Sequence, residues 1–155
     1  MKIKLLVMDV DGTLTDGHIY FSENGEVMKA FHVQDGYAIA HKLPLVNVMP
    51  IIITGKSSEI VRKRAAELKI REVHQGISDK LTKLKEIIEK YGVSPDEVAY
   101  IGDDENDLEC MQFCGLTACP ADALPMVRRA VDYVCQRDGG RGAVREFIDK
   151  ILNDI

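Results

Sequence analysis

The chain has 155 residues, of which 46% are hydrophobic and 29% charged, with a formal net charge of −5 at pH 7, and this predicts a single domain spanning residues 1–155. The acidic balance argues against binding of nucleic-acid backbones, which proteins contact through excess Lys and Arg. The apolar runs are too short to span a bilayer, and the N-terminus does not resemble a secretion signal, so we expect a cytoplasmic protein with neither nucleic-acid nor membrane partners.

Apolar runs rich in β-branched residues alternate along the chain with helical patterns. The expected strands cover residues 3–8, 48–53, 72–74, 98–101, 116–118 and 132–135. Helices are expected at 57–68 and 79–91, and Ser94-Pro95-Asp96-Glu97 has the form of a capping box. The alternation predicts an α/β fold with an open parallel sheet in a Rossmann-like three-layer α/β/α arrangement. Folds of this class bind ligands at the carboxyl ends of their strands.

One segment, at about residues 17–32, departs from the alternation. Two short β-rich runs flank Ser22-Glu23-Asn24-Gly25, and Asn-Gly at this point predicts a β-hairpin, because Asn24 and Gly25 as central residues can both adopt positive φ. Such a flap would overhang the end of the first strand. Its aromatic side chains require a cover, either from further copies of the chain or from the chain's own body.

Prolines and cysteines add local expectations. Pro44 is expected to end the helix from Tyr37 early, and Pro50 to leave the first part of its strand unpaired. The four cysteines lack the paired spacing of zinc sites. We therefore expect them to be buried free thiols in a reducing compartment.

Two carboxylates, Asp9 and Asp11, follow the first expected strand in the run Asp9-Val10-Asp11-Gly12-Thr13. Isolated Asp is rarely buried, so a metal, a cation or hydrogen bonds must compensate this pair. Polar groups also follow later strands, in Thr54-Gly55-Lys56, Ser78-Asp79-Lys80 and Gly102-Asp103-Asp104-Glu105-Asn106-Asp107. Acids, a hydroxyl and cations at neighbouring strand ends suit a phosphoryl group held on Mg²⁺.

In this order, the motifs resemble those of the haloacid dehalogenase superfamily of phosphatases. The resemblance implies that Asp9 is the nucleophile, which forms an aspartyl phosphate, and that Asp11 is the acid/base. It also implies that Thr54, Gly55 and Lys80 bind the phosphate.

The same resemblance implies a Mg²⁺ site. Its ligands would be Asp9, Asp103 and the backbone carbonyl of Asp11. Asp104 or Asp107 would act through water or by orienting Lys80.

Two other classes of function compete with this interpretation. A phosphate-binding receiver domain also uses acids, a hydroxyl and a Lys, but it carries adjacent acids after its first strand and a lone acceptor Asp after its third. Here the spaced pair comes first and the adjacent pair, Asp103-Asp104, comes last. A non-catalytic assembly domain would have no need of the complete set of polar strand ends.

Neither gap between the first three motifs can hold a cap domain of about 50 residues, so a capless member is expected. Outside the motifs, Asp16-Gly17, Gln34-Asp35-Gly36-Tyr37 and the run from Gly139 to Glu146 resemble the 3-deoxy-D-manno-octulosonate 8-phosphate phosphatases over nearly the whole chain. That family implies a phosphorylated sugar-acid substrate, lipopolysaccharide biosynthesis, and a homotetramer that shares its sites between subunits through the hairpins.

Two residues are expected to bind the sugar acid. Arg141 corresponds to a substrate-binding position in the tail segment, although it also stands where a C-terminal helix begins. Lys56 occupies a position where an Arg often follows Thr-Gly, and Lys cannot form the bidentate carboxylate contact of Arg. A nine-carbon keto-deoxy acid 9-phosphate therefore stands as the alternative substrate.

Overall fold

A six-stranded sheet forms the centre of the computed structural model, which describes residues 2–154. Its strands are β1 (Leu5–Met8), β4 (Met49–Ile53), β5 (Glu72–His74), β6 (Val98–Ile101), β7 (Leu116–Cys119) and β8 (Tyr133–Val134). They lie in the order β5-β4-β1-β6-β7-β8, and each neighbouring pair is parallel. The chain builds outward from β1 on one side and then crosses to β6 on the other. The strand order thus reverses beside β1, where open sheets of this kind bind ligands.

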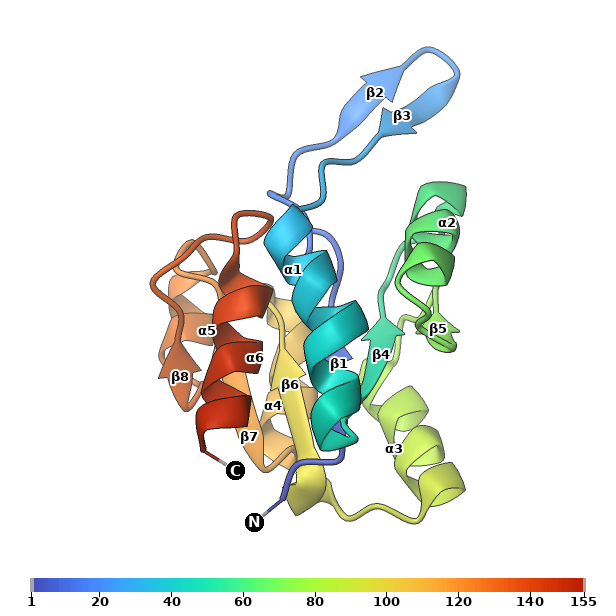
Figure 1. The fold of residues 1–155 in the computed structure, drawn as a ribbon. Coiled ribbons are helices and arrows are strands. Elements are labelled where there is room, and N and C mark those ends of the chain that lie inside the picture. Colours follow the sequence, from blue (N-terminus) through green and yellow to red (C-terminus); the bar gives the residue numbers. More distant parts are fainter. Residues whose placement is uncertain (1, 155) are drawn as a thin grey trace.

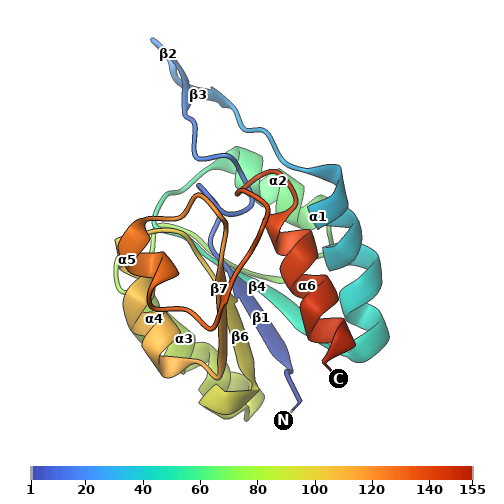
Figure 2. The same cartoon turned by 90° about the vertical axis from the view of Figure 1, so that its left-hand side faces the viewer.

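Helices cover both faces of the sheet, so the α/β fold class predicted from the sequence is confirmed (Figures 1 and 2). One layer contains α1 (Val33–Tyr37), α2 (Glu59–Glu67) and α6 (Ala143–Asn153), and the other α3 (Lys80–Tyr91), α4 (Leu108–Phe113) and α5 (Pro125–Arg128). β1 packs against both layers: Leu6 and Met8 join one core, and Leu5 and Val7 join the other. A strand buried on both faces explains the uninterrupted apolar run before Asp9. No helix within residues 2–154 has the length and apolar character needed to cross a bilayer.

The expected strands and the helices expected at 57–68 and 79–91 agree with the structure to within two residues at their ends, whereas the helix expected from Tyr37 begins earlier, at Val33. The strands at 72–74 and 98–101 have the bounds expected, and the helices expected at 57–68 and 79–91 begin one or two residues later than predicted. The capping box at Ser94 is present and starts a single 3-10 turn, Pro95–Glu97, before β6. The differences fall at element ends, where the last backbone hydrogen bonds fray.

The predicted hairpin is present as β2 (Tyr20–Ser22) and β3 (Gly25–Met28), and it projects from the carboxyl edge of the sheet (Figure 1). The turn differs from the expectation. Ser22 pairs with Gly25, so the central residues are Glu23 and Asn24, and of these three turn positions Gly25 alone has positive φ, at 105°. A glycine that closes the turn in the left-handed region makes two positive φ values unnecessary.

The two prolines affect the backbone less than expected. After α1 the helical path continues through a π turn, Ala38–Lys42, and a 3-10 turn, Leu43–Val46, which accommodates Pro44 in its first turn, where no N–H donor is needed. Pro50 pairs with Leu6 on β1. Its ring nitrogen faces β5, where pairing begins only at Ile51, so the expected loss of pairing applies to that side alone.

The four cysteines are free thiols, as predicted. Cys110, Cys119 and Cys135 are buried, whereas Cys114 is only half-buried. Burial raises the pKa of Cys110 to about 12 and that of Cys119 to about 11, which makes these thiols unreactive at neutral pH.

Candidate active site

Asp9 lies at the carboxyl end of β1 with its side chain almost wholly buried, since the residue is 6% exposed. Its backbone N–H donates to the carbonyl of Ile101 (3.1 Å), the last residue of β6. The position of Asp9 is therefore fixed by the two central strands at the reversal of strand order.

Lys80 supplies the cation that compensates Asp9. Asp79 caps α3 by accepting the N–H of Thr82 (3.1 Å), so the helix begins at Lys80 and directs this side chain back toward the sheet. Lys80 Nζ donates to Asp9 Oδ1 (3.1 Å) and Asp107 Oδ1 (2.8 Å), and its side chain is only 1% exposed. Burial lowers the pKa of Lys80, but the two carboxylates raise it above its ordinary value, so the amine stays charged.

Three carboxylates meet beside this amine. Oxygens of Asp9, Asp103 and Asp107 all lie within 4.8 Å of one another. Burial, then the charge of Asp107, raises the pKa of Asp9, although Lys80 opposes the rise. Burial and the contact with Asp9 raise the pKa of Asp103 to about 9. The three carboxylates thus carry more negative charge than the single amine of Lys80 can neutralise. Hard oxygen donors in this arrangement fit a divalent cation such as Mg²⁺.

Gly12 makes room for Asp103 in the loop after β1. It adopts a φ of 89°, and a Cβ at this position would lie 2.0 Å from Asp103 Oδ2. The hydroxyl of Thr13 donates to the other oxygen, Oδ1, at 3.1 Å. The two residues after Asp11 therefore place the Asp103 carboxylate against the loop.

Asp107 is wholly buried and held by four donors. Besides Lys80, the hydroxyl of Tyr100 donates to its Oδ1 (2.5 Å), and the backbone N–H groups of Asp103 and Asp104 donate to its Oδ2 (3.2 Å each). Burial, reinforced by the charge of Asp107, raises the pKa of Tyr100 well above its usual value, so the phenol remains a donor. Asp107 is thus a rigid support for Lys80.

Asp104 and Asp11 point elsewhere. The exposed Asp104 accepts the N–H of Glu105 (2.7 Å) and caps the 3-10 turn Glu105–Asp107, so its carboxylate does not join the cluster. The carboxylate of Asp11 accepts a hydrogen bond from Lys29 Nζ (2.6 Å), at the base of the hairpin. The structure therefore brings Asp9, Lys80, Asp103 and Asp107 together, whereas the side chain of Asp11 pairs with the hairpin.

Thr54 lies buried where β4 ends. Its backbone N–H donates to the carbonyl of His74 (2.9 Å), at the end of the neighbouring strand β5. Gly55 and Lys56 follow it on the exposed loop. The pKa of Glu26 in the hairpin is lowered chiefly by its hydrogen bond to Lys29 and also by the charge of Lys56, which places Lys56 on the hairpin side of the site.

Arg141 is exposed on a segment that packs against the loop of the first motif in the same chain. Gly140 N–H donates to the carbonyl of Thr13 (3.0 Å), and a Cβ on Gly139 would lie 1.9 Å from the carbonyl oxygen of Gly12. These two glycines allow backbone to contact backbone. Arg141 therefore directly follows a segment that packs on the first-motif loop of its own chain, one residue before the Gly142 that precedes α6.

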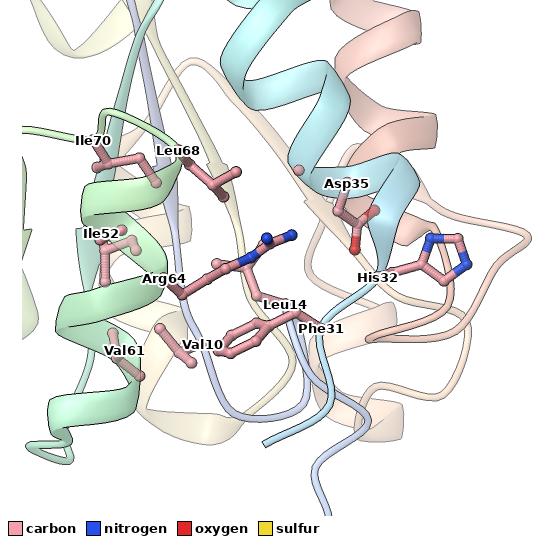
Figure 3. Close-up of a pocket in the computed structure, with 12 residues that line it drawn as sticks. Val10, Leu14, Phe31, His32, Asp35, Ile52, Val61, Arg64, Leu68 and Ile70 are labelled. Carbon is pink, nitrogen blue, oxygen red and sulfur yellow. The ribbon is translucent and has the colours of Figure 1, made fainter. Parts of the chain in front are cut away.

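A small apolar cavity between α1 and α2 lies apart from this cluster (Figure 3). Its volume of about 10 Å³ has room for about one water molecule, so it cannot hold a sugar phosphate. Arg64 stacks over Phe31 (5.4 Å) across the cavity toward Asp35, and among residues 2–154 neither Arg64 Nε nor Asp35 Oδ2 finds a hydrogen-bond partner. Asp35 Oδ1 accepts the N–H of Arg145 (2.8 Å) in the first turn of α6. The contacts around this cavity link α1, α2 and α6, and the cavity is not the substrate site.

Sequence reasoning missed Lys29, Thr13 and Tyr100. A hydroxyl in the otherwise aliphatic run of β6 was a usable signal for Tyr100, because a buried phenol needs a partner. Thr13 stood within the first motif. Lys29 carried no local signal, because its partner Asp11 lies across the chain reversal that forms the hairpin.

Comparisons with known proteins show the family to which the chain belongs. Residues 54–148 match the family model of haloacid dehalogenase-like hydrolases. A 3-deoxy-D-manno-octulosonate 8-phosphate phosphatase of Salmonella typhi is 46% identical over 151 residues, which cover 97% of this chain and 80% of the relative.

Two solved structures are similar throughout. The cobalt-bound deoxy-D-mannose-octulosonate 8-phosphate phosphatase of Haemophilus influenzae has a TM-score of 0.94 at 39% identity, covering 98% of this chain and 88% of that one. The Moraxella catarrhalis 3-deoxy-D-manno-octulosonate 8-phosphate phosphatase, in complex with a magnesium ion, a phosphate ion and a KDO molecule, has a TM-score of 0.93 at 42% identity, covering 97% and 86%. The chain therefore belongs to the haloacid dehalogenase-like hydrolases and, within them, to the 3-deoxy-D-manno-octulosonate 8-phosphate phosphatase family.

Proposed function

We propose that this chain hydrolyses 3-deoxy-D-manno-octulosonate 8-phosphate with Mg²⁺ as cofactor, through an aspartyl phosphate on Asp9. The observation that carries the proposal is the buried contact between Asp9 and Lys80 inside a cluster of carboxylates. Relatives at 46% identity are phosphatases of this sugar acid, and the Moraxella structure contains a magnesium ion, a phosphate ion and a KDO molecule. The family assignment disfavours the receiver-domain alternative.

Asp9, Asp103 and the backbone carbonyl of Asp11 would hold the metal. When bound, Mg²⁺ supplies positive charge that stabilises the phosphoryl oxygens. Asp107 keeps Lys80 in place, and Gly12 leaves the space that Asp103 needs. The raised pKa values of Asp9 and Asp103 support a site that is completed by a cation.

Asp9 attacks phosphorus, so that a bond forms between its carboxylate oxygen and phosphorus while the ester P–O bond breaks. Asp11 gives its proton to the departing sugar oxygen. Lys80 and Thr54, with the N–H of Gly55, bind the phosphoryl oxygens. Water then attacks the aspartyl phosphate, Asp11 takes the proton of that water, and Asp9 is released together with phosphate.

Arg141 and Lys56 are proposed to bind the sugar acid. Both are exposed, Arg141 on the segment that packs against the first-motif loop and Lys56 on the loop after Thr54, where its charge acts on Glu26 of the hairpin. Arg at this place offers a planar pair of donors to a carboxylate. Without a cap domain, the site is open for a substrate of this size to enter.

We also propose that the chain forms a homotetramer through its hairpins. Four flap side chains, Ile19, Phe21, Val27 and Met28, are between 53% and 75% exposed. Such apolar exposure on a projecting hairpin favours a protein partner, and a neighbouring flap would cover the open site. The four free thiols support a cytoplasmic location.

A substrate panel tests the activity. Phosphate release is measured with the eight-carbon 8-phosphate and the nine-carbon 9-phosphate, with Mg²⁺ present and after chelation. We expect Mg²⁺-dependent turnover, with the higher kcat/KM for the eight-carbon substrate. Asp9→Asn should show no turnover, although its circular dichroism spectrum should match that of the wild type. Full activity of Asp9→Asn would contradict the mechanism. A higher kcat/KM for the nine-carbon 9-phosphate would contradict the proposed eight-carbon substrate.

Solution mass tests the assembly. Light scattering at micromolar concentration should give a mass four times that of one chain for the wild type, and a lower mass for Phe21→Ser. A monomeric wild type would contradict sharing of sites between subunits.

A further inference from the structure

Lys29 is a buried amine at the base of the projecting hairpin. It follows β3, whose last residues, Val27 and Met28, are 55% and 54% exposed, yet the Lys29 side chain is only 2% exposed. Lys is almost never buried without partners, because removing its charge from water is costly. The hairpin thus turns one charged side chain back into the molecule.

Two carboxylates receive this amine. Lys29 Nζ lies 2.6 Å from Asp11 Oδ1 and 2.8 Å from Glu26 Oε2. Burial lowers the pKa of Lys29, but its hydrogen bonds to Asp11 and Glu26 raise it above the ordinary value, so the amine is charged at neutral pH. Charge-assisted hydrogen bonds of this kind are shorter and stronger than neutral ones.

Glu26 is itself fixed to the body of the protein. Its Oε1 accepts a hydrogen bond from the Ser58 hydroxyl (2.9 Å), and Ser58 caps α2 by accepting the N–H of Ile60 (3.2 Å). Glu26 therefore links the hairpin to the helix that follows the Thr54 loop. Lys29 is held from the helix side and cannot swing freely away from Asp11.

We propose that Lys29 is a positioning residue for Asp11, which it holds by Oδ1 so that Oδ2 is presented to the sugar oxygen that leaves phosphorus. This proposal rests on the phosphatase function proposed above, in which Asp11 transfers the proton. Lys29 reaches no residue of the carboxylate cluster among its ion pairs in residues 2–154, so it acts on Asp11 and not on Asp9. The hairpin thereby contributes to the chemistry in addition to any role in association.

The test compares two leaving groups. A sugar alkoxide requires a proton as it departs, whereas p-nitrophenolate departs without one. The value of kcat/KM reports the phosphoryl-transfer step, so loss of the general acid should lower kcat/KM for the sugar phosphate alone. Lys29→Met should lower kcat/KM for the sugar-acid phosphate roughly tenfold to a hundredfold, the range expected when a charged hydrogen bond that orients the acid is lost. With p-nitrophenyl phosphate it should change little.

Matched variants complete the test. Lys29→Arg, which keeps charge and donors, should recover most of the sugar-phosphate rate, and Lys29→Met should have no further effect in an Asp11→Asn background. If Lys29→Met does not fold, Lys29→Gln replaces it, with circular dichroism and solution mass as checks. Equal losses on both substrates, or an unchanged sugar-phosphate rate, would overturn the proposal. A wild type inactive on both substrates would instead contradict the proposed function.

Discussion

Replacing Lys80 with methionine removes the cation shared by Asp9 and Asp107. Lys80 Nζ lies 3.1 Å and 2.8 Å from the two carboxylates, and at 1% exposure of its side chain water cannot take its place. Removing one partner of a buried ion pair costs about 3–5 kcal/mol. Tyr100 and two backbone N–H groups still hold Asp107, so the second carboxylate adds little to the loss. We therefore expect the free energy of unfolding of the metal-free protein at pH 7 to fall by about 3–5 kcal/mol.

Urea unfolding, with and without Mg²⁺, measures this loss. Lys83→Met is the matched control, because Lys83 lies on the same helix and its pair with Glu86 (2.8 Å) is at the surface, where such pairs contribute little. Millimolar Mg²⁺ should restore part of the stability of Lys80→Met, since it binds only the native carboxylate cluster. A loss no larger than that of Lys83→Met would refute the account of Lys80 as the compensating cation.

Three further changes test other parts of the protein. Gly12→Ala places a Cβ 2.0 Å from Asp103 Oδ2 and should abolish Mg²⁺ binding in calorimetry. Gly92→Ala is the control, because Gly92 also has positive φ but open space around it, and this variant should bind Mg²⁺ normally. Normal Mg²⁺ affinity in Gly12→Ala would contradict the packing argument. Burial raises the pKa of Asp35 to about 6, so the native state favours its protonated form and loses stability as pH rises from about 4 to about 6. Asp35→Asn should flatten that part of the stability profile by up to about 3 kcal/mol, and an unchanged slope would refute the assignment. Arg141→Ala should raise KM for the sugar-acid phosphate roughly tenfold with kcat retained, and an unchanged KM would leave Arg141 a structural residue.

The strand ends were predictable because parallel strands deliver their carboxyl ends to one edge of a sheet. An apolar run that stops at Asp9, and another that stops at Asp103, must therefore place both carboxylates at that edge. Lys80 was expected at the same edge, in the run that follows a strand, whereas its direct hydrogen bond to Asp9 is a finding of the structure.

Side-chain directions were not predictable to the same degree. Asp104 and Asp107 were equivalent candidates in the sequence, and only the backbone of the turn after β6 decides that Asp107 points inward while Asp104 caps the turn. The contact between Lys29 and Asp11 depends on how the hairpin folds back over β1, and neither residue carries a local sign of the other. The hairpin turn itself was misjudged because Asn-Gly can occupy either register of a tight turn.

Covalent capture of the phosphorylated enzyme tests the central claim most directly. Asp11→Asn, in which hydrolysis of the intermediate lacks its base, is mixed with Mg²⁺ and p-nitrophenyl phosphate, whose leaving group needs no proton from Asp11. It is then treated with borohydride, which reduces an aspartyl phosphate to homoserine. Peptide mass mapping should find homoserine at position 9, and none when Mg²⁺ is chelated. Substrate turnover by the wild type without homoserine at position 9 in the trapped variant would contradict Asp9 as the nucleophile.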